Sequence, residues 1–241
     1  MFNIDQYTQR TGLASCQANE AGLFALQRAQ LSTIAFENID PYLGSVPSLE
    51  SHQIWAKVVT GGRGGYCFEL NCVFGEALRH FGFTARPILG RVRMGAPVGG
   101  IRAHLAWIVM IGGEEWLADA AFGGPGPRDP MRLQPGVQVS GGTEFRLRRD
   151  QETGECVLER HNADGWFGLY GFNELHFTRE DIEGANQLCA TWDMLPFRNN
   201  LMMSIRLPAR MWHCLAATSG GLGIRGRSMR RSPPPMSWLA T

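Results

Sequence analysis

Cys67 is the side chain of this sequence best placed for nucleophilic chemistry. It follows a glycine-rich run, residues 61–65, through which backbone can approach a ligand without side-chain clashes. An amphipathic helix is expected to begin near Cys67, and the unpaired N–H groups and dipole of a helix N-terminus favour a thiolate over a thiol. The sequence therefore predicts an activated cysteine, which needs a base to take up and return its proton.

A base and a carboxylate come from one predicted hairpin. His104 begins an expected strand over residues 104–111, Asp119 lies in the next over residues 116–121, and Gly-Gly at 112–113 makes a two-residue loop. Side chains alternate along a strand, so this loop makes His104 and Asp119 diagonal neighbours on one face. An Asp that binds one imidazole nitrogen fixes the tautomer and supports the imidazolium formed when the other nitrogen takes a thiol proton.

Each of these three residues also has an ordinary structural interpretation. A cysteine at a helix start is more often part of the core, a strand histidine is commonly buried and satisfied, and an Asp before a glycine-rich loop is commonly a turn former. Only the combination favours acyl-thioester chemistry, in the manner of papain-like and transglutaminase-like thiol enzymes. A peptidase or amidase of that kind therefore stays open as an alternative.

The elements that position these residues change character after residue 83. Apolar residues recur at helical intervals over residues 6–36, which predicts two helices, and a third helix follows residue 65 and ends at Gly82. From residue 84 the pattern is that of strands, expected at 84–92, 104–111, 116–121, 143–149, 156–160 and 166–172. Helices followed by strands predict an α+β fold.

Three regions are expected along the chain. Residues 1–83 form an N-terminal helical bundle that carries the nucleophile. Residues 84–190 form a β-barrel or sheet domain that carries His104 and Asp119. Residues 191–241 form an interdomain segment followed by an atypical C-terminal region.

Composition and charge exclude several kinds of partner. Of the 241 residues 44% are hydrophobic and 19% charged, with a net charge of +1, so no global charge attracts nucleic acid or a membrane surface. No apolar run reaches the roughly 18 residues of a membrane span, and no signal peptide is evident, which predicts a cytoplasmic protein. The six cysteines are scattered without zinc-site spacing, so we expect reduced thiols and no metal.

The C-terminal residues differ in composition from the rest of the chain. Residues 206–241 contain six Arg and no Asp or Glu, whereas the remainder carries all 22 acidic residues. No helical or strand period persists through this segment, and it includes three consecutive prolines at 233–235. We expect it to be loosely structured.

Several motifs in register resemble one known family. The segment RGGYCFELN at residues 63–71 is similar to the active-site signature of the arylamine N-acetyltransferases, and AFENID at 35–40 is similar to the Phe-Glu-Asn motif upstream of it. His104, and Asp119 within LADAAFGG at 117–124, fall where the family keeps its other triad members. FRNNL at 197–201 resembles a further family segment, so the resemblance covers roughly residues 1–205.

The resemblance implies acetyl transfer by a ping-pong cycle. Cys67 would take the acetyl group from acetyl-coenzyme A, and an arylamine, hydrazine or arylhydroxylamine would accept it, a role in xenobiotic metabolism. His104 would act as base and acid and Asp119 would orient it. The resemblance also assigns the substrate pocket to Phe36, Phe122, Gly123 and Gly124, with Arg63 and Asn71 in support, although Phe36 and Phe122 are equally well explained as core residues.

The family continues past FRNNL into a third, α/β segment that covers the active-site cleft. From about Arg206 the sequence ceases to resemble it, which predicts an incomplete or aberrant C-terminal α/β lid and suggests a change of reading frame or divergence within a lineage. An impaired, non-catalytic or hydrolytic relic of the family therefore stays open as a second function. The preferred amine and the oligomeric state are left open.

Overall fold

The computed structural model describes residues 3–207, 210–217 and 224–228, and its fold is α+β, as predicted. The three main predicted helices are present as α1, α2 and α5. Among the described residues no helix is long and apolar enough to cross a membrane. The helices are α1 (Ile4–Thr11), α2 (Glu20–Thr33), α3 (Ile39–Tyr42), α4 (Ser51–Ile54), the π-helix η1 (Trp55–Thr60), α5 (Cys67–His80) and α6 (Arg179–Thr191).

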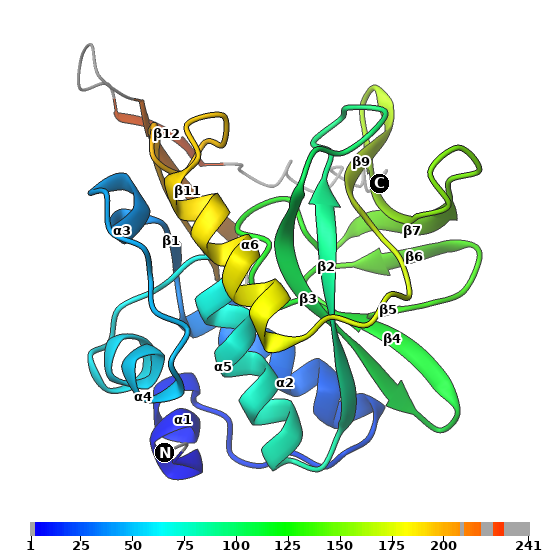
Figure 1. The fold of residues 1–241 in the computed structure, drawn as a ribbon. Coiled ribbons are helices and arrows are strands. Elements are labelled where there is room, and N and C mark those ends of the chain that lie inside the picture. The colour runs from blue at the N-terminus through cyan, green and yellow to red at the C-terminus, as the bar shows by residue number, and fades with distance from the viewer. Residues whose placement is uncertain (1–2, 208–209, 218–223, 229–241) are drawn as a thin grey trace, which may run out of the picture.

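Eight strands form one antiparallel sheet in the order β5-β4-β3-β2-β9-β8-β7-β6, drawn in green shades in Figure 1. All six predicted strands are present, and β5 and β6 are additional. The strands are β2 (Thr84–Val92), β3 (Arg102–Ile111), β4 (Glu114–Ala118), β5 (Met131–Arg132), β6 (Val137–Ser140), β7 (Thr143–Arg149), β8 (Cys156–Asn162) and β9 (Gly165–Phe172).

The β3–β4 hairpin has the predicted two-residue turn. Gly112 and Gly113 both have positive φ, 59° and 85°, and Ile111 pairs with Glu114. Two successive left-handed residues match the twist of the flanking strands, which is why glycine occupies both positions. β4 ends at Ala118, earlier than predicted, because the backbone N–H groups of residues 119–121 donate to side chains instead of to β3.

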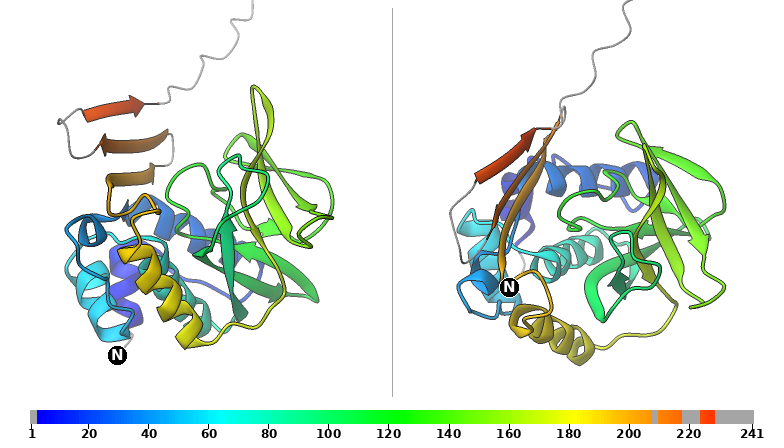
Figure 2. Two further views of the ribbon diagram at one scale, coloured as in Figure 1. Left: turned by 45° about the horizontal axis from the view of Figure 1, so that its top comes forward. Right: turned by 90° about the horizontal axis from the view of Figure 1, so that it is seen from above.

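A second antiparallel sheet, in the order β1-β10-β11-β12, brings together segments far apart in the sequence. Figure 2 shows it on the helical side of the molecule, apart from the larger sheet. Its strands are β1 (Phe36–Glu37), β10 (Asn200–Leu207), β11 (Arg210–Ala217) and β12 (Ile224–Ser228).

Asn38, directly after β1, fixes this pairing with its side chain. Asn38 Nδ2 donates to Phe197 O at 2.7 Å and to Asn200 O at 2.8 Å. Asn38 Oδ1 accepts from Met202 N at 2.7 Å. Because the residue is buried, each of these bonds satisfies a polar group that water does not reach. The Phe-Glu-Asn segment is thereby attached to β10.

The prediction of a loosely structured segment from residue 206 is wrong for the residues that the structure describes. β10 runs to Leu207, it pairs with β11, and β11 pairs with β12. A strand ladder is made by backbone groups, so an Arg-rich and acid-free composition does not oppose it. The rest of that prediction, including the prolines at 233–235, lies outside the described residues.

Helical segments were the other features that the sequence pattern missed. α6 lies in a region where only strands and turns were expected, and a capping box begins it: Asp181 N donates to Thr178 Oγ1 at 3.3 Å, and Thr178 N to Asp181 Oδ2 at 2.8 Å. α3, α4 and η1 lie between residue 36 and the glycine-rich run, where no helix was predicted.

Helix α5 packs against β3 and β2, and Gly75 is one of its contact residues. A Cβ on Gly75 would lie 2.0 Å from a ring atom of Trp107 on β3. The same indole donates from Nε1 to Asn71 O at 2.8 Å. Because α5 carries Cys67 and β3 carries His104, this glycine sets the spacing between them.

Gly75→Ala is expected to destabilise the protein by about 1–3 kcal/mol, because the added methyl group overpacks the contact with Trp107. Gly184→Ala in α6 is the matched control. No atom lies within 4 Å of a Cβ at Gly184, so alanine there is expected to stabilise by roughly 0.5–1 kcal/mol through helix propensity. Thermal unfolding measures both. Stabilisation by both substitutions would contradict the close packing at Gly75.

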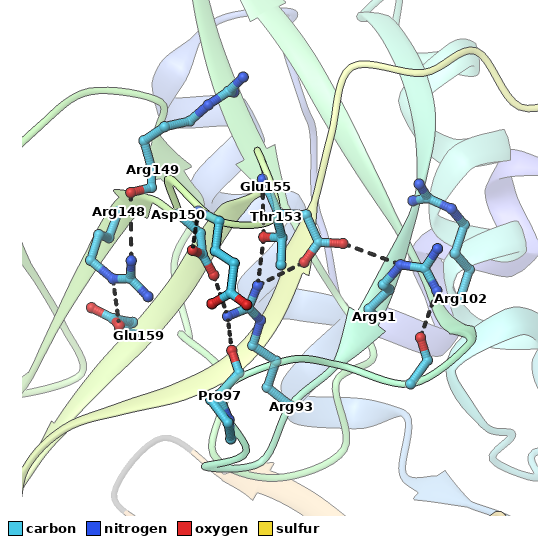
Figure 3. Close-up of polar contacts among 12 residues, drawn as sticks. Arg91, Arg93, Pro97, Arg102, Arg148, Arg149, Asp150, Thr153, Glu155 and Glu159 are labelled. Carbon is cyan, nitrogen blue, oxygen red and sulfur yellow. Dashed lines mark hydrogen bonds and ion pairs between the residues drawn. The ribbon is translucent and has the colours of Figure 1, made fainter.

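The loop after β2 is tied to the β7–β8 hairpin by a buried group of ion pairs, shown in Figure 3. Arg93 lies 2.7 Å from Asp150 Oδ2 and 2.8 Å from Glu155 Oε2, and Arg91 lies 3.2 Å from Glu155 Oε1. Removing one partner from a buried pair leaves an uncompensated charge. These contacts therefore hold the loop after β2 against the β7–β8 hairpin.

Candidate active site

Cys67 is the first residue of α5, as predicted. Tyr66 is the N-cap residue, and its N–H donates to Glu69 Oε2 at 3.3 Å. The Cys67 thiol is buried and donates to Ala103 O at 3.7 Å. The sulfur is thus placed beside the backbone of the residue that precedes His104.

The glycine run brings a second segment alongside the start of α5. Gly65 N donates to Ala35 O at 3.3 Å, and Glu37 N donates to Gly65 O at 2.9 Å. A Cβ on Gly64 would lie 2.1 Å from Ala35 O. Any side chain at that position would separate the two segments, so glycine is required for Phe36 to lie near the nucleophile.

The thiol of Cys67 is not activated by its helix position alone. Burial raises the pKa of Cys67 well above its ordinary value, and Cys189 and Asp119 add to the rise, while the backbone N–H groups of Leu105 and Phe68 oppose it. In such a site a thiolate is stable only beside the group that takes its proton. The helix N-terminus alone therefore does not account for a thiolate at Cys67, and the need for a partner base stays a prediction.

His104 and Asp119 meet as the hairpin predicted. His104 Nε2 lies 2.7 Å from Asp119 Oδ2, and both side chains are buried. The imidazole ring packs against two aromatic rings, with centroids 4.9 Å from Phe122 and 4.8 Å from Tyr170, and these two rings also contact each other. With Nε2 bound to the carboxylate, Nδ1 is the nitrogen left for proton exchange.

Four donors hold the Asp119 carboxylate. Besides His104, Asn71 Nδ2 lies 3.1 Å and Ala121 N lies 3.0 Å from Oδ1, and the Tyr170 hydroxyl lies 2.9 Å from Oδ2. Burial disfavours the ionised form, but His104, Asn71 and Ala121 together hold the pKa of Asp119 below its ordinary value. A buried carboxylate with this many donors stays ionised and keeps its orientation.

The four residues expected in the substrate pocket line one cavity. Phe36, Phe122, Gly123 and Gly124 surround it, and Asp119 also reaches its wall. Gly123 has a φ of 76°, and a Cβ there would lie 2.7 Å from the Phe36 ring. Glycine therefore lets the loop close against the Phe36 side chain.

The chain matches the family model described as N-acetyltransferase over residues 21–219. An arylamine N-acetyltransferase of Escherichia coli K12 is 36% identical over 208 residues, which are 85% of this chain and 73% of that protein. An arylamine N-acetyltransferase / N-hydroxyarylamine O-acetyltransferase of Salmonella typhimurium is 35% identical over 77% of this chain and 66% of its own length. The chain belongs to the arylamine N-acetyltransferase family.

Solved structures of this family agree with the assignment. The arylamine N-acetyltransferase of Salmonella typhimurium superposes with a TM-score of 0.84 and 28% identity, covering 95% of this chain and 85% of that one. The Mycobacterium marinum enzyme in complex with CoA superposes with a TM-score of 0.83 and 28% identity, covering 95% and 87%. This arylamine N-acetyltransferase family member is thus an acyltransferase.

The family match also corrects the predicted limit of the resemblance. It continues to residue 219, so the prediction that family-like sequence stops near Arg206 is wrong. Arg206 itself contributes to the pocket: its guanidinium donates to Gly124 O at 2.8 Å and to Gly126 O at 2.6 Å. Ser204 on the same strand donates to Gly123 O. β10 therefore holds the glycine loop of this family member in place.

Arg63, expected in a supporting role, lies apart from the His104–Asp119 pair. Its guanidinium lies 2.9 Å from Glu37 Oε1 and 3.0 Å from Asp40 Oδ1. It therefore joins the glycine run to the Phe-Glu-Asn segment. Asn71, the other supporting residue, is buried within the carboxylate network.

Two residues of the network were not predicted from the sequence. Gln27 on α2 accepts a hydrogen bond from Asp119 N at 2.9 Å, and Tyr170 on β9 donates to the carboxylate. Tyr170 lies in a predicted strand, and the alternation of side chains assigns it to one face of that strand. Its partner Asp119, however, lies 51 residues away in the sequence. No local pattern identifies such a pair.

Proposed function

We propose that this chain transfers an acetyl group from acetyl-coenzyme A to an aromatic amine, hydrazine or arylhydroxylamine through an acetyl-thioester on Cys67. The observation that carries the proposal is the buried His104–Asp119 pair. His104 directly follows Ala103, whose backbone oxygen accepts the hydrogen bond from the Cys67 thiol. A nucleophile, a base and an orienting carboxylate at one buried place are the requirements of acyl-thioester chemistry.

In the first half-reaction His104 takes the thiol proton and Cys67 attacks the acetyl carbon. Because burial raises the pKa of Cys67, the proton moves to Nδ1 as the thiolate forms, giving an ion pair that Asp119 supports through Nε2. The tetrahedral intermediate collapses with cleavage of the bond to the coenzyme A sulfur. The imidazolium returns its proton to that sulfur, so His104 acts as base and then as acid.

In the second half-reaction the amine takes the place of coenzyme A. His104 removes a proton from the attacking nitrogen, and the bond between the acetyl carbon and the Cys67 sulfur breaks. The imidazolium then returns its proton to the sulfur, which restores the thiol. Phe36, Phe122, Gly123 and Gly124 line the cavity in which we place the aromatic ring of the acceptor. The geometry thus favours flat acceptors.

Asn71 and Tyr170 act on the reaction through Asp119. Each donates to the carboxylate, at 3.1 Å and 2.9 Å, and neither is available to accept the imidazole proton. Burial and the adjacent carboxylate raise the pKa of Tyr170 well above its ordinary value, so its hydroxyl keeps its proton and stays a donor. These contacts keep Asp119 directed at Nε2.

A non-catalytic or hydrolytic relic was the alternative raised by the C-terminal composition. That alternative depended on a break in the family sequence near Arg206, and the break is not at that position. Acetyl transfer is therefore the function that we put forward.

The test is to mix the enzyme with acetyl-coenzyme A in the absence of an amine. We expect one equivalent of coenzyme A to be released and one acetyl group to be found on Cys67 by mass spectrometry. Addition of aniline should then remove that group and yield the acetylated amine. p-Nitrophenyl acetate is a second donor that separates acylation from recognition of coenzyme A. Transfer to aniline without an acetyl-enzyme, or acetylation at another residue, would contradict the mechanism.

A further inference from the structure

Two buried thiols share one backbone acceptor beside His104. Cys67 Sγ and Cys189 Sγ each lie 3.7 Å from Ala103 O. The two sulfur atoms are therefore separated by no more than twice that distance. Cys67 is 3% exposed and Cys189 is fully buried. After burial, Cys189 is the largest influence on the pKa of Cys67, as expected for neighbouring buried groups.

Helix α6 is attached to the start of α5 one turn before Cys189. The Tyr66 hydroxyl donates to Asn186 O at 3.3 Å and also contacts the Asn186 side-chain oxygen. Asn186 Nδ2 in turn donates to Pro47 O at 2.9 Å. The residue before Cys67 is thus bonded to the residue one helical turn before Cys189. Figure 1 shows α6 lying across α5 beside β3. The two thiols are neighbours because packed elements hold them there.

We propose that Cys67 and Cys189 are a redox pair that forms a reversible disulfide when the enzyme meets a peroxide. The Cys67 thiolate attacks hydrogen peroxide, the O–O bond breaks, and the His104 imidazolium protonates the departing hydroxide, so the products are a sulfenic acid, one water and a neutral imidazole. The Cys189 thiol then attacks the Cys67 sulfur. An S–S bond forms, the S–O bond breaks, and the hydroxide leaves with the thiol proton as a second water. Both sulfur atoms are oxidised and the peroxide is reduced.

This pairing gives Cys189 the role of a resolving cysteine. The disulfide blocks the Cys67 sulfur and so stops acetyl transfer. It also prevents further oxidation of Cys67, and a thiol reductant can reduce it. A sulfenic acid without a thiol partner proceeds to sulfinic and sulfonic acids, which thiols do not reduce. The inference rests on the proposed role of Cys67 as the reactive thiol.

The disulfide can be detected without an activity assay. Reduced protein is freed of reductant, treated with a small excess of hydrogen peroxide, blocked with iodoacetamide and digested with trypsin and a Glu-specific protease. Cleavage after Glu69 separates Cys67 from Cys72, so the partner of each is unambiguous. We expect linked peptides containing Cys67 and Cys189 that dithiothreitol separates. Linkage of Cys67 to another cysteine, or Cys67 found only as its oxyacids, would overturn the proposal.

Cys189→Ser and the matched control Cys72→Ser test the protective role. Acetyl transfer after peroxide and then dithiothreitol is expressed as a fraction of each protein's own untreated activity. We expect the wild type and Cys72→Ser to recover most of their activity, and Cys189→Ser to recover several-fold less. Equal recovery by all three would refute the resolving role. If Cys67 is never acetylated, the proposed function fails, and the peptide measurement still decides on the disulfide.

Discussion

Replacement of Cys67 by alanine is expected to lower kcat/KM for acetyl transfer by about 10⁴-fold or more, the scale seen when a member of a catalytic triad is removed. The reason is that in the proposed mechanism the sulfur forms the covalent intermediate, and alanine offers no nucleophile in its place. Acetylation of the enzyme by acetyl-coenzyme A alone should disappear as well. Intact-protein mass spectrometry and a coenzyme A release assay measure the two effects.

Cys72→Ala is the matched control for that experiment. Cys72 lies on α5 five residues after Cys67, and burial raises its pKa to about 12. It shares the helix of the nucleophile but has neither the N-terminal position nor the contact with Ala103 O. Acetylation of this variant should match that of the wild type. Persistence of acetyl transfer in Cys67→Ala would assign the nucleophile to another residue.

Asp119→Asn is expected to lower the rate of acylation by about 10⁴-fold, as an amide does at the equivalent place in a Ser-His-Asp triad. An amide presents an N–H group either to His104 Nε2, which favours the wrong tautomer, or to the donors Asn71 and Ala121, which then lack an acceptor. The variant keeps the size of the side chain, so the fold is expected to be retained. Stopped-flow acylation by p-nitrophenyl acetate measures the loss directly.

The pH dependence of that variant is a second readout. Without a His104 imidazolium stabilised by Asp119, Cys67 must lose its proton to solvent. Burial raises the pKa of Cys67. The residual acylation rate of Asp119→Asn should therefore keep rising with pH above the range in which the wild type is constant. Asp150→Asn, which removes a buried partner of Arg93, is the control and should acylate normally per folded molecule. A near-normal rate in Asp119→Asn would exclude Asp119 from the mechanism.

Local patterns predicted the part of the site that depends on neighbouring residues. The glycine pair at 112–113 and the alternation of the two strands predicted the contact between His104 and Asp119, because a two-residue turn fixes the register of the whole hairpin. The helix start at Cys67 followed in the same way from the glycine run and the apolar stripe. In each case the determining interactions lie within a few residues.

The rest of the site depends on packing between distant segments, which one sequence does not reveal. Gln27 and Tyr170 reach Asp119 across 92 and 51 residues. The pairing of the thiols through Ala103 also needs α6, whose capping box at Thr178 and Asp181 is a local signal that was missed. The prediction from composition was wrong for residues 206–207 and 210–217, because backbone pairing does not depend on the acid content of a strand.

The hydrogen bonds of Asn38 affect the order in which parts of the chain can fold during translation. Its three side-chain bonds join residues 159–164 positions apart. When Phe36 leaves the ribosome, β10, the strand that pairs with it, has yet to be translated. Closing a loop of this length costs chain entropy, whereas contacts between residues close in sequence avoid most of that cost. The hairpin with His104 and Asp119 can form well before β10 exists. A nascent chain can therefore form the hairpin that carries His104 and Asp119 before the strand that pairs with Phe36 has been translated.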